Sequence, residues 1–361
     1  MDIVSCKTFD SKVIAGHTGV DILTDVDDIS NLMRYKNTIS GVITDEKGLL
    51  SHSVIFLKQM CASIAVVEND ILSRIRNSES LIIDGRRHVI IINPDESLMN
   101  SVINKVRQPL DINNITTSDG IKISLSASVL TYKDIIEATD KFPVDIGMWR
   151  SEGILIGGED EEKSYRSAFD RCRKINVRLF DVTGDKTELC KNISQDELCE
   201  MQIKKLIDAA QGRMFNIIIP NVEDEKDILN VKPMFRGNVG FGAMIETPSA
   251  VILCDDIMRH CAFVNIGFNG LMREFKSTRA AVKAAQRVAL ASRKTGIPAV
   301  ACGIKLCDPA FLKLVIGAGI TKFCLPETDF NDFAAAAKSI SYTEAVIQTS
   351  SFLGSYYAAL A

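Results

Sequence analysis

The stretch VGFGAMIETPSAVILCDDIMRHCAFVNI, from Val239 to Ile266, contains two apolar segments separated by a helix-like one. The segments Val239–Ile245 and Phe263–Ile266 are apolar on both faces, as parallel strands covered by helices are. The segment between them, Ser249–Met258, is predicted as a helix. Together they predict a strand, a crossover helix and a second parallel strand.

The same alternation of strand and helix extends from Ile121 to the end of the chain. Eight strand–helix units in about 240 residues match the size of a (β/α)₈ barrel. A doubly wound open sheet is the structural alternative. The predicted strands are Ile121–Ala127, Asp145–Arg150, Asn176–Asp181, Phe215–Ile219, Val239–Ile245, Phe263–Ile266, Ala299–Cys302 and Lys322–Leu325. The clearest predicted helices are Glu161–Lys174, Ser194–Ala210, Ser249–Met258 and Arg279–Thr295.

The first hundred residues also alternate strand and helix, but in shorter elements. Strands are predicted over 38–44 and 62–67, a hairpin over 81–93 and a helix over 94–106. The polar stretch after this helix is predicted as a linker. The predicted organisation is therefore a small α/β domain (1–106), a linker (107–120) and a barrel (121–361).

His52 stands at the start of a predicted helix, after a predicted strand and loop. The segment Gly41-Val-Ile-Thr-Asp-Glu-Lys-Gly-Leu-Leu-Ser51-His52 is predicted as a strand, a glycine-containing loop and the start of a helix. An imidazole there can hold a phosphoryl group, because the free N–H groups of a helix N-terminus favour anions. The alternative is a serine cap followed by a surface histidine.

Composition excludes several classes of protein. The 361 residues carry 42 basic and 46 acidic side chains, a formal net charge of −4. This balance predicts neither nucleic-acid binding nor a polybasic membrane arm. We expect no signal peptide and no membrane-spanning helix. The 10 cysteines form no Cys-x-x-Cys pair, so reduced thiols in a cytoplasmic protein are expected.

The predicted barrel strands end in residues that suit an anionic ligand. Arg150 and Arg178 end successive strands, and Arg279 follows a later one. Guanidinium groups bind phosphate or carboxylate through paired donors. The alternative is that these arginines pair with acidic side chains or backbone carbonyls of the fold.

Three further residues follow strands five, six and seven. The carboxylate of Glu246 and the amide oxygen of Asn269 could bind Mg²⁺ if substrate oxygens completed the shell. Cys302 could transfer a proton, and nearby arginines are expected to lower its pKa. The alternatives are hydrogen-bonding residues of the fold and an inert buried cysteine.

Taken together, six ordered segments resemble the PEP-utilising enzyme family, and most closely enzyme I of the sugar phosphotransferase system. The segment that ends at His52 resembles the family's phosphohistidine signature. The other five resemble segments of the family's barrel, and the resemblance covers about Asp21 to Lys338. These five are Met148-Trp-Arg-Ser-Glu152, Val177-Arg-Leu-Phe-Asp-Val-Thr-Gly-Asp-Lys186, Met244-Ile-Glu-Thr-Pro-Ser-Ala250, Asn265-Ile-Gly-Phe-Asn-Gly270 and Ala301-Cys-Gly with Cys307-Asp-Pro309.

The resemblance implies a swivelling phosphohistidine domain followed by a barrel of the phosphoenolpyruvate/pyruvate type. His52 would take the phosphoryl group, and Cys302 would protonate the enolate as pyruvate forms. The implied ligands of phosphoenolpyruvate (PEP) and the metal are Arg150, Arg178, Asn269 and Arg279 for the substrate and Glu246 for Mg²⁺. A phosphocarrier protein acceptor and a homodimer are also implied.

Some positions depart from the family pattern. Gly270 stands where the family has its second metal carboxylate, so Mg²⁺ binding is expected to be weakened or lost. Asp308, Glu274 and Asp185 are candidates to replace it. An arginine pair is missing between 187 and 199, and Leu50 replaces a threonine. The helical domain that docks the phosphocarrier protein is expected to be absent.

Two hypotheses follow. The first is a PEP-dependent phosphotransferase that phosphorylates itself at His52 and then an acceptor. The second is a degenerate relative that binds PEP, pyruvate or a partner protein without turnover. A dikinase that uses ATP is disfavoured, since the chain has no segment of the size of an ATP-grasp domain.

Overall fold

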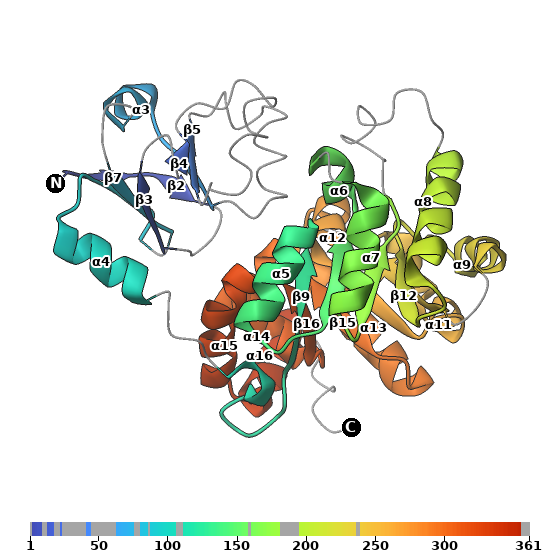
Figure 1. Cartoon of the computed structure of the whole chain (residues 1–361). Coiled ribbons are helices and arrows are strands. Elements are labelled where there is room, and N and C mark those ends of the chain that lie inside the picture. Colours follow the sequence, from blue (N-terminus) through green and yellow to red (C-terminus); the bar gives the residue numbers. More distant parts are fainter. Residues whose placement is uncertain are drawn as a thin grey trace. The chain divides into compact units, whose positions relative to one another are not determined.

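The computed structural model of the chain describes residues 2–8, 13–17, 22–23, 41–44, 63–75, 80–85, 87–105, 111–157, 160–180, 195–235 and 239–354. The chain forms two compact units, Met1–Pro109 and Leu110–Ala361 (Figure 1). The helix predicted to begin at His52 lies outside the described residues.

The first unit contains two four-stranded sheets. Its strands are β1 (Asp2–Ser5), β2 (Lys7–Thr8), β3 (Val13–His17), β4 (Ile22–Leu23), β5 (Gly41–Thr44), β6 (Ser63–Val66), β7 (Ser80–Asp84) and β8 (Val89–Ile92). The antiparallel sheet has the order β1-β8-β7-β3, and the predicted hairpin over 81–93 is its β7–β8 pair. The second sheet has the order β2-β6-β5-β4, with β5 parallel to both β4 and β6.

Helices α3 (Asn69–Ile75) and α4 (Glu96–Lys105) complete the described part of this unit. Its core joins the two sheets, because Ile43 of β5, Leu72 of α3 and Ile83 of β7 are buried in one cluster. Strand β5 is buried along its whole length, as its sequence GVIT allows.

The second unit is a closed barrel of eight parallel strands, so the open-sheet alternative is excluded. The strands are β9 (Ser124–Val129), β10 (Ile146–Arg150), β11 (Ile175–Arg178), β12 (Phe215–Ile219), β13 (Val239–Ile245), β14 (Phe263–Gly267), β15 (Ala299–Cys302) and β16 (Lys322–Leu325). Strand β9 closes the barrel between β10 and β16. The predicted α/β class and (β/α)₈ barrel are confirmed.

Helices surround the barrel. They are α5 (Tyr132–Lys141), α6 (Glu152–Gly157), α7 (Glu161–Arg171), α8 (Gln195–Ala210), α9 (Glu225–Val231), α10 (Pro248–Ile252), α11 (Cys254–Arg259), α12 (Phe268–Phe275), α13 (Thr278–Thr295), α14 (Pro309–Gly317), α15 (Phe330–Ser339) and α16 (Tyr342–Leu353). Of the helices that the structure describes, none has both the length and the apolar character needed to cross a membrane.

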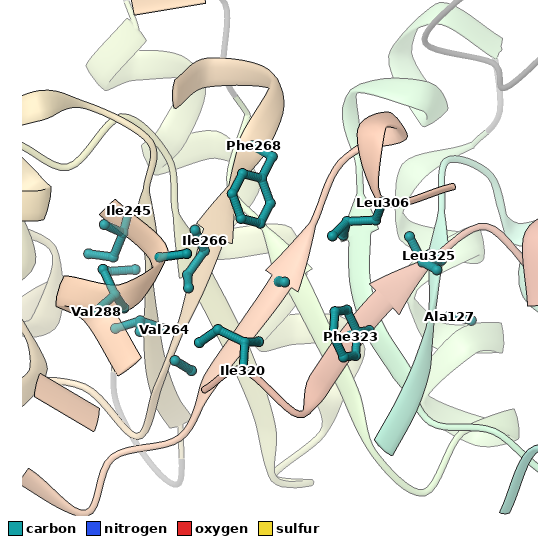
Figure 2. Packing of buried hydrophobic residues seen from close by; sticks show 14 of the residues in the cluster. Ala127, Ile245, Val264, Ile266, Phe268, Val288, Leu306, Ile320, Phe323 and Leu325 are labelled. Carbon is teal, nitrogen blue, oxygen red and sulfur yellow. The ribbon is translucent and has the colours of Figure 1, made fainter. Parts of the chain in front are cut away.

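The main core lies between the strands and these helices. Figure 2 shows part of it, with Val264 and Ile266 of β14 near Val288 of α13. Residues 110–120 belong to this unit, and Ile112 and Ile115 are buried in the same core. The role of segment 107–120 as a linker stays a prediction.

A second, smaller core fills the inside of the barrel. It is formed by side chains from six different strands, which can meet only at the barrel axis. They are Met148, Ile218, Met244, Phe263, Cys302 and Cys324. Cys302 therefore faces the barrel interior and lies at the carboxyl end of its strand.

Local caps fix where the helices begin. The Ser277 hydroxyl accepts a hydrogen bond from the Ala280 amide at the start of α13, and Gly296 ends that helix with a φ of 74°. Asp308 performs the same task for α14, since its Oδ1 accepts from the Ala310 amide at 2.9 Å. Such caps satisfy backbone groups that a helix end would otherwise leave without partners.

Candidate active site at the carboxyl ends of the barrel strands

The structure brings five of the predicted residues to one end of the barrel. Arg150, Arg178 and Cys302 are the last residues of β10, β11 and β15, and Glu246 directly follows β13. Asn269 is the second residue of α12, which follows β14 without a loop. All eight strands are parallel, so these ends form one face, where barrel enzymes place their chemistry.

Arg178 is held by an acidic neighbour. Its Nη2 donates to Oε1 of Glu152, and the two side chains are only 10% and 5% exposed. Glu152 is the first residue of α6, directly after the β10 strand end. The pair keeps the guanidinium at the strand end, but it also neutralises much of the charge available to a ligand.

A buried polar network supports the end of β11. The Ser151 hydroxyl donates to the Arg178 carbonyl at 2.7 Å and accepts from Nε2 of Gln202 at 2.7 Å. The same amide nitrogen contacts the Tyr165 hydroxyl at 3.0 Å, and Gln202 Oε1 accepts from the Phe180 amide at 2.7 Å. Sequence reasoning missed this network, because its members come from two helices, a strand end and loops without any local motif.

Arg150 is half-buried, and its position in register with Arg178 puts the two guanidinium-bearing residues on adjacent strands. Its charge lowers the pKa of both interior thiols, Cys302 and Cys324, although burial outweighs that effect. Arg150 therefore directs its charge toward the inside of the barrel.

Cys302 is a buried thiol whose pKa lies above its ordinary value. Burial is the largest cause, followed by the neighbouring Cys324 and Glu246, while Arg178 and Arg150 act in the opposite direction. The two arginines lower this pKa, as the sequence predicts, but burial raises it by more, because removing a thiolate from water costs more free energy than the two guanidinium groups supply. The Sγ atom donates to the Ile266 carbonyl at 3.4 Å, so the thiol keeps its proton.

Glu246 contacts the loop that follows β12. Its Oε1 accepts from the Asn221 amide at 3.2 Å. The next residue, Thr247, donates its hydroxyl to the Val222 carbonyl at 3.1 Å. The end of β13 thus holds the neighbouring loop at two points.

Asn269 is exposed at the start of α12. Its Oδ1 accepts from the Ile304 amide at 3.1 Å. A backbone N–H must meet an oxygen, which fixes the orientation of the amide group. The Nδ2 donors remain for a ligand, so Asn269 suits an anionic oxygen better than a cation.

Arg279 has a partner within the fold. It is the second residue of α13, and its Nη2 donates to the carbonyl of Leu353, the last residue of α16, at 2.8 Å. This contact is the alternative that the sequence left open, an arginine that caps a carbonyl. His52 lies outside the described residues, as does Asp185.

The residues that the structure describes do not fit a protein-held Mg²⁺. Within the described ranges, no group of three His, Cys, Asp or Glu side chains is arranged to hold a metal. At position 270 a glycine replaces the expected carboxylate. Of the candidate replacements, Asp308 caps α14 and Glu274 pairs with Arg273 at 3.3 Å. Among the described candidates, Glu246 alone offers a carboxylate, so waters and substrate oxygens would have to supply the other five oxygens that Mg²⁺ prefers.

The interior thiols predict a loss of stability at alkaline pH. Burial raises the pKa of Cys324 from 9.0 to about 12, and that of Cys302 also lies above its ordinary value. The stability that these protonated thiols contribute is fully present below pH 9. As the pH rises toward the folded pKa, the unfolded chain loses these protons first, so the free energy of unfolding falls by roughly 1.4 kcal/mol per pH unit for each thiol. Urea midpoints between pH 8 and pH 11 measure this slope. Cys324→Ala should flatten it, and an unchanged slope would contradict the assignment.

Comparison with known proteins identifies the class. Residues 188–341 match the model of the PEP-binding domain of PEP-utilising enzymes. This segment contains β12 to β16 of the barrel. This part of the chain is thus similar to the PEP-binding domain of the PEP-utilising enzymes, and the resemblance found in the sequence is confirmed.

The individual relatives are named phosphoenolpyruvate-protein phosphotransferases. That of Cupriavidus necator is 24% identical over 85% of this chain and 64% of its own length. The relatives from Staphylococcus epidermidis and Haloferax volcanii are 23% and 20% identical over 81% and 85% of this chain. The chain spans 62–64% of the length of these three. The solved structure of RipC from Yersinia pestis covers 60% of the chain with 11% identity and a TM-score of 0.42, too slight a likeness to argue from.

Proposed function

We propose that this chain is a PEP-dependent phosphotransferase of the enzyme I type. The barrel binds PEP, the phosphoryl group passes to His52, and pyruvate is released. The observation that carries the proposal is the environment of Cys302, a protonated thiol at the barrel mouth whose pKa responds to Arg150, Arg178 and Glu246. A site with Arg150, an Arg178 that is paired with Glu152, and a neutral acid suits an anion that must gain a proton.

Binding would rest on the strand-end arginines. Arg150 and Arg178 would hold the phosphate and carboxylate of PEP, and the Nδ2 donors of Asn269 would contact an oxygen of the ligand. Arg279 is left out of this set, because it donates to the Leu353 carbonyl.

The proposed reaction moves one phosphoryl group and one proton. A ring nitrogen of His52 attacks phosphorus, the bond between phosphorus and the enol oxygen breaks, and the enolate of pyruvate remains. The Cys302 thiol gives its proton to the methylene carbon of the enolate, which yields pyruvate. The thiolate then regains a proton from water. A phosphocarrier protein would take the phosphoryl group from His52.

A second candidate function is binding of PEP or pyruvate without turnover. The observation that favours it is Gly270, where the carboxylate expected for the metal is missing and where a Cβ atom would lie 2.9 Å from Glu246 Cβ. Without a dication, the two arginines alone must stabilise the charge that develops during transfer.

Pyruvate release in a single turnover separates the two candidates. The wild type, at high concentration with PEP, is expected to form pyruvate, and Cys302→Ala should slow that step about 100-fold, the usual contribution of a positioned acid. Cys324→Ala is the matched control, since this thiol is also buried in the same interior cluster. No pyruvate from the wild type would favour binding without turnover, and equal rates for both alanine variants would remove Cys302 from the reaction.

A further inference from the structure

The start of α12 lies directly against Glu246. A Cβ atom built on Gly270 would be 2.9 Å from Glu246 Cβ and 3.0 Å from the Glu246 carbonyl oxygen. One built on Gly267 would be 2.9 Å from both Cβ and Oε2 of the same glutamate. Two glycines, one at the end of β14 and one in the first turn of α12, therefore make room for this one side chain.

This packing bears on why position 270 has no carboxylate. An aspartate at position 270 would meet a Cβ atom and a backbone oxygen of Glu246, neither of which can rotate away as the end of a long side chain can. The helix or the strand end would have to shift before a second carboxylate could point at a metal. The packing of this chain thus favours glycine at position 270, and an aspartate there would need a local shift of the helix or the strand end.

Glu246 makes structural contacts that do not involve a cation. Its carboxylate accepts from the Asn221 amide, and Thr247 beside it donates to the Val222 carbonyl, at 3.2 and 3.1 Å. The first turn of α12 supplies a favourable dipole to the same carboxylate. The loop after β12 and the start of α12, which carries Asn269, are therefore both packed on one side chain.

From these contacts we propose that the barrel mouth binds its PEP-class ligand without a divalent cation held by the protein, and that Glu246 is a positioning residue. It fixes the loop at Asn221 and supports the helix turn that presents Asn269. The inference rests on the proposed function for the identity of the ligand, and it assigns to Glu246 a role other than that of a metal ligand.

Glutamine at position 246 distinguishes the two roles. Its amide oxygen can still accept from Asn221, whereas an amide is a far weaker ligand for Mg²⁺ than a carboxylate. A positioning role predicts that Glu246→Gln binds PEP within about threefold of the wild type and that Glu246→Ala binds more than about tenfold more weakly. If Glu246→Gln lost affinity as fully as Glu246→Ala, the positioning role would be overturned.

The metal itself is tested by calorimetry of PEP with Mg²⁺ and with EDTA. The dissociation constant is expected to change by less than about threefold. Titration of Mn²⁺ without PEP, followed by electron paramagnetic resonance, should show no bound ion in the wild type or in Gly270→Asp. Tighter PEP binding in Mg²⁺ by tenfold or more, or a bound Mn²⁺ in either protein, would overturn the inference. Absence of PEP binding in both media would instead refute the proposed function, while the Mn²⁺ result still decides the metal.

Discussion

Arg178→Ala is expected to lower the free energy of unfolding of the barrel by about 3–5 kcal/mol, the cost of breaking a buried ion pair. The substitution removes the guanidinium that binds Glu152, whose side chain is only 5% exposed. The Glu152 carboxylate then stays buried without its donor, because water has little access to it. The effect is larger than that of breaking a surface pair, because the remaining buried charge regains neither a partner nor its hydration.

Trp149 makes this measurement specific to the barrel. It is the one tryptophan of the chain, it is fully buried, and it directly precedes Arg150 in β10. Its fluorescence during urea unfolding therefore follows the second unit alone. The matched control is Arg166→Ala, which breaks a pair with Glu162 whose side chains are 47% and 57% exposed and should cost less than about 1 kcal/mol.

The outcome is decided by the difference between the two variants. Equal costs for Arg178→Ala and Arg166→Ala would mean that the buried pair contributes no more than a surface one. A double variant, Arg178→Met with Glu152→Leu, should recover much of the loss, since replacing both partners with apolar groups avoids an isolated buried charge.

The barrel could be predicted from sequence because its strands are short and apolar and recur at regular intervals. The strand predicted at Ile121–Ala127 is instead β9, Ser124–Val129, and Thr116 pairs with Lys122 before it. The sequence SLSASV of β9 places serines among its apolar residues, which weakens the apolar signal used to find its ends. Strands whose both faces are apolar, such as β13, were located without this error.

Candidate site residues could be chosen because parallel strands bring their carboxyl ends together. Their partners could not be predicted. Arg279 donates to Leu353, which lies 74 residues further along the chain. Gln202 on α8 reaches Ser151 and Tyr165 only through the packing of α7 against α8. Whether a polar side chain binds a ligand or the fold depends on such distant contacts, which leave no pattern in the local sequence.

The expected effect of His52→Ala is complete loss of phosphoryl transfer, because the proposed reaction has no other acceptor. The chain has 4 histidines. His88 contacts the Thr8 hydroxyl at 2.7 Å, and His17 is exposed on β3. In the sequence, neither stands at the start of a predicted helix as His52 does. His17→Ala is thus a matched control for the loss of one imidazole from the same unit.

The most direct measurement is incubation of the purified chain with phosphorus-labelled PEP, followed by assay of acid-labile label on the protein. We expect about one phosphoryl group per chain on the wild type and on His17→Ala, and none on His52→Ala, as a covalent phosphohistidine requires. Label that persists on His52→Ala, or a wild type that binds PEP and takes no label, would contradict the proposed transfer.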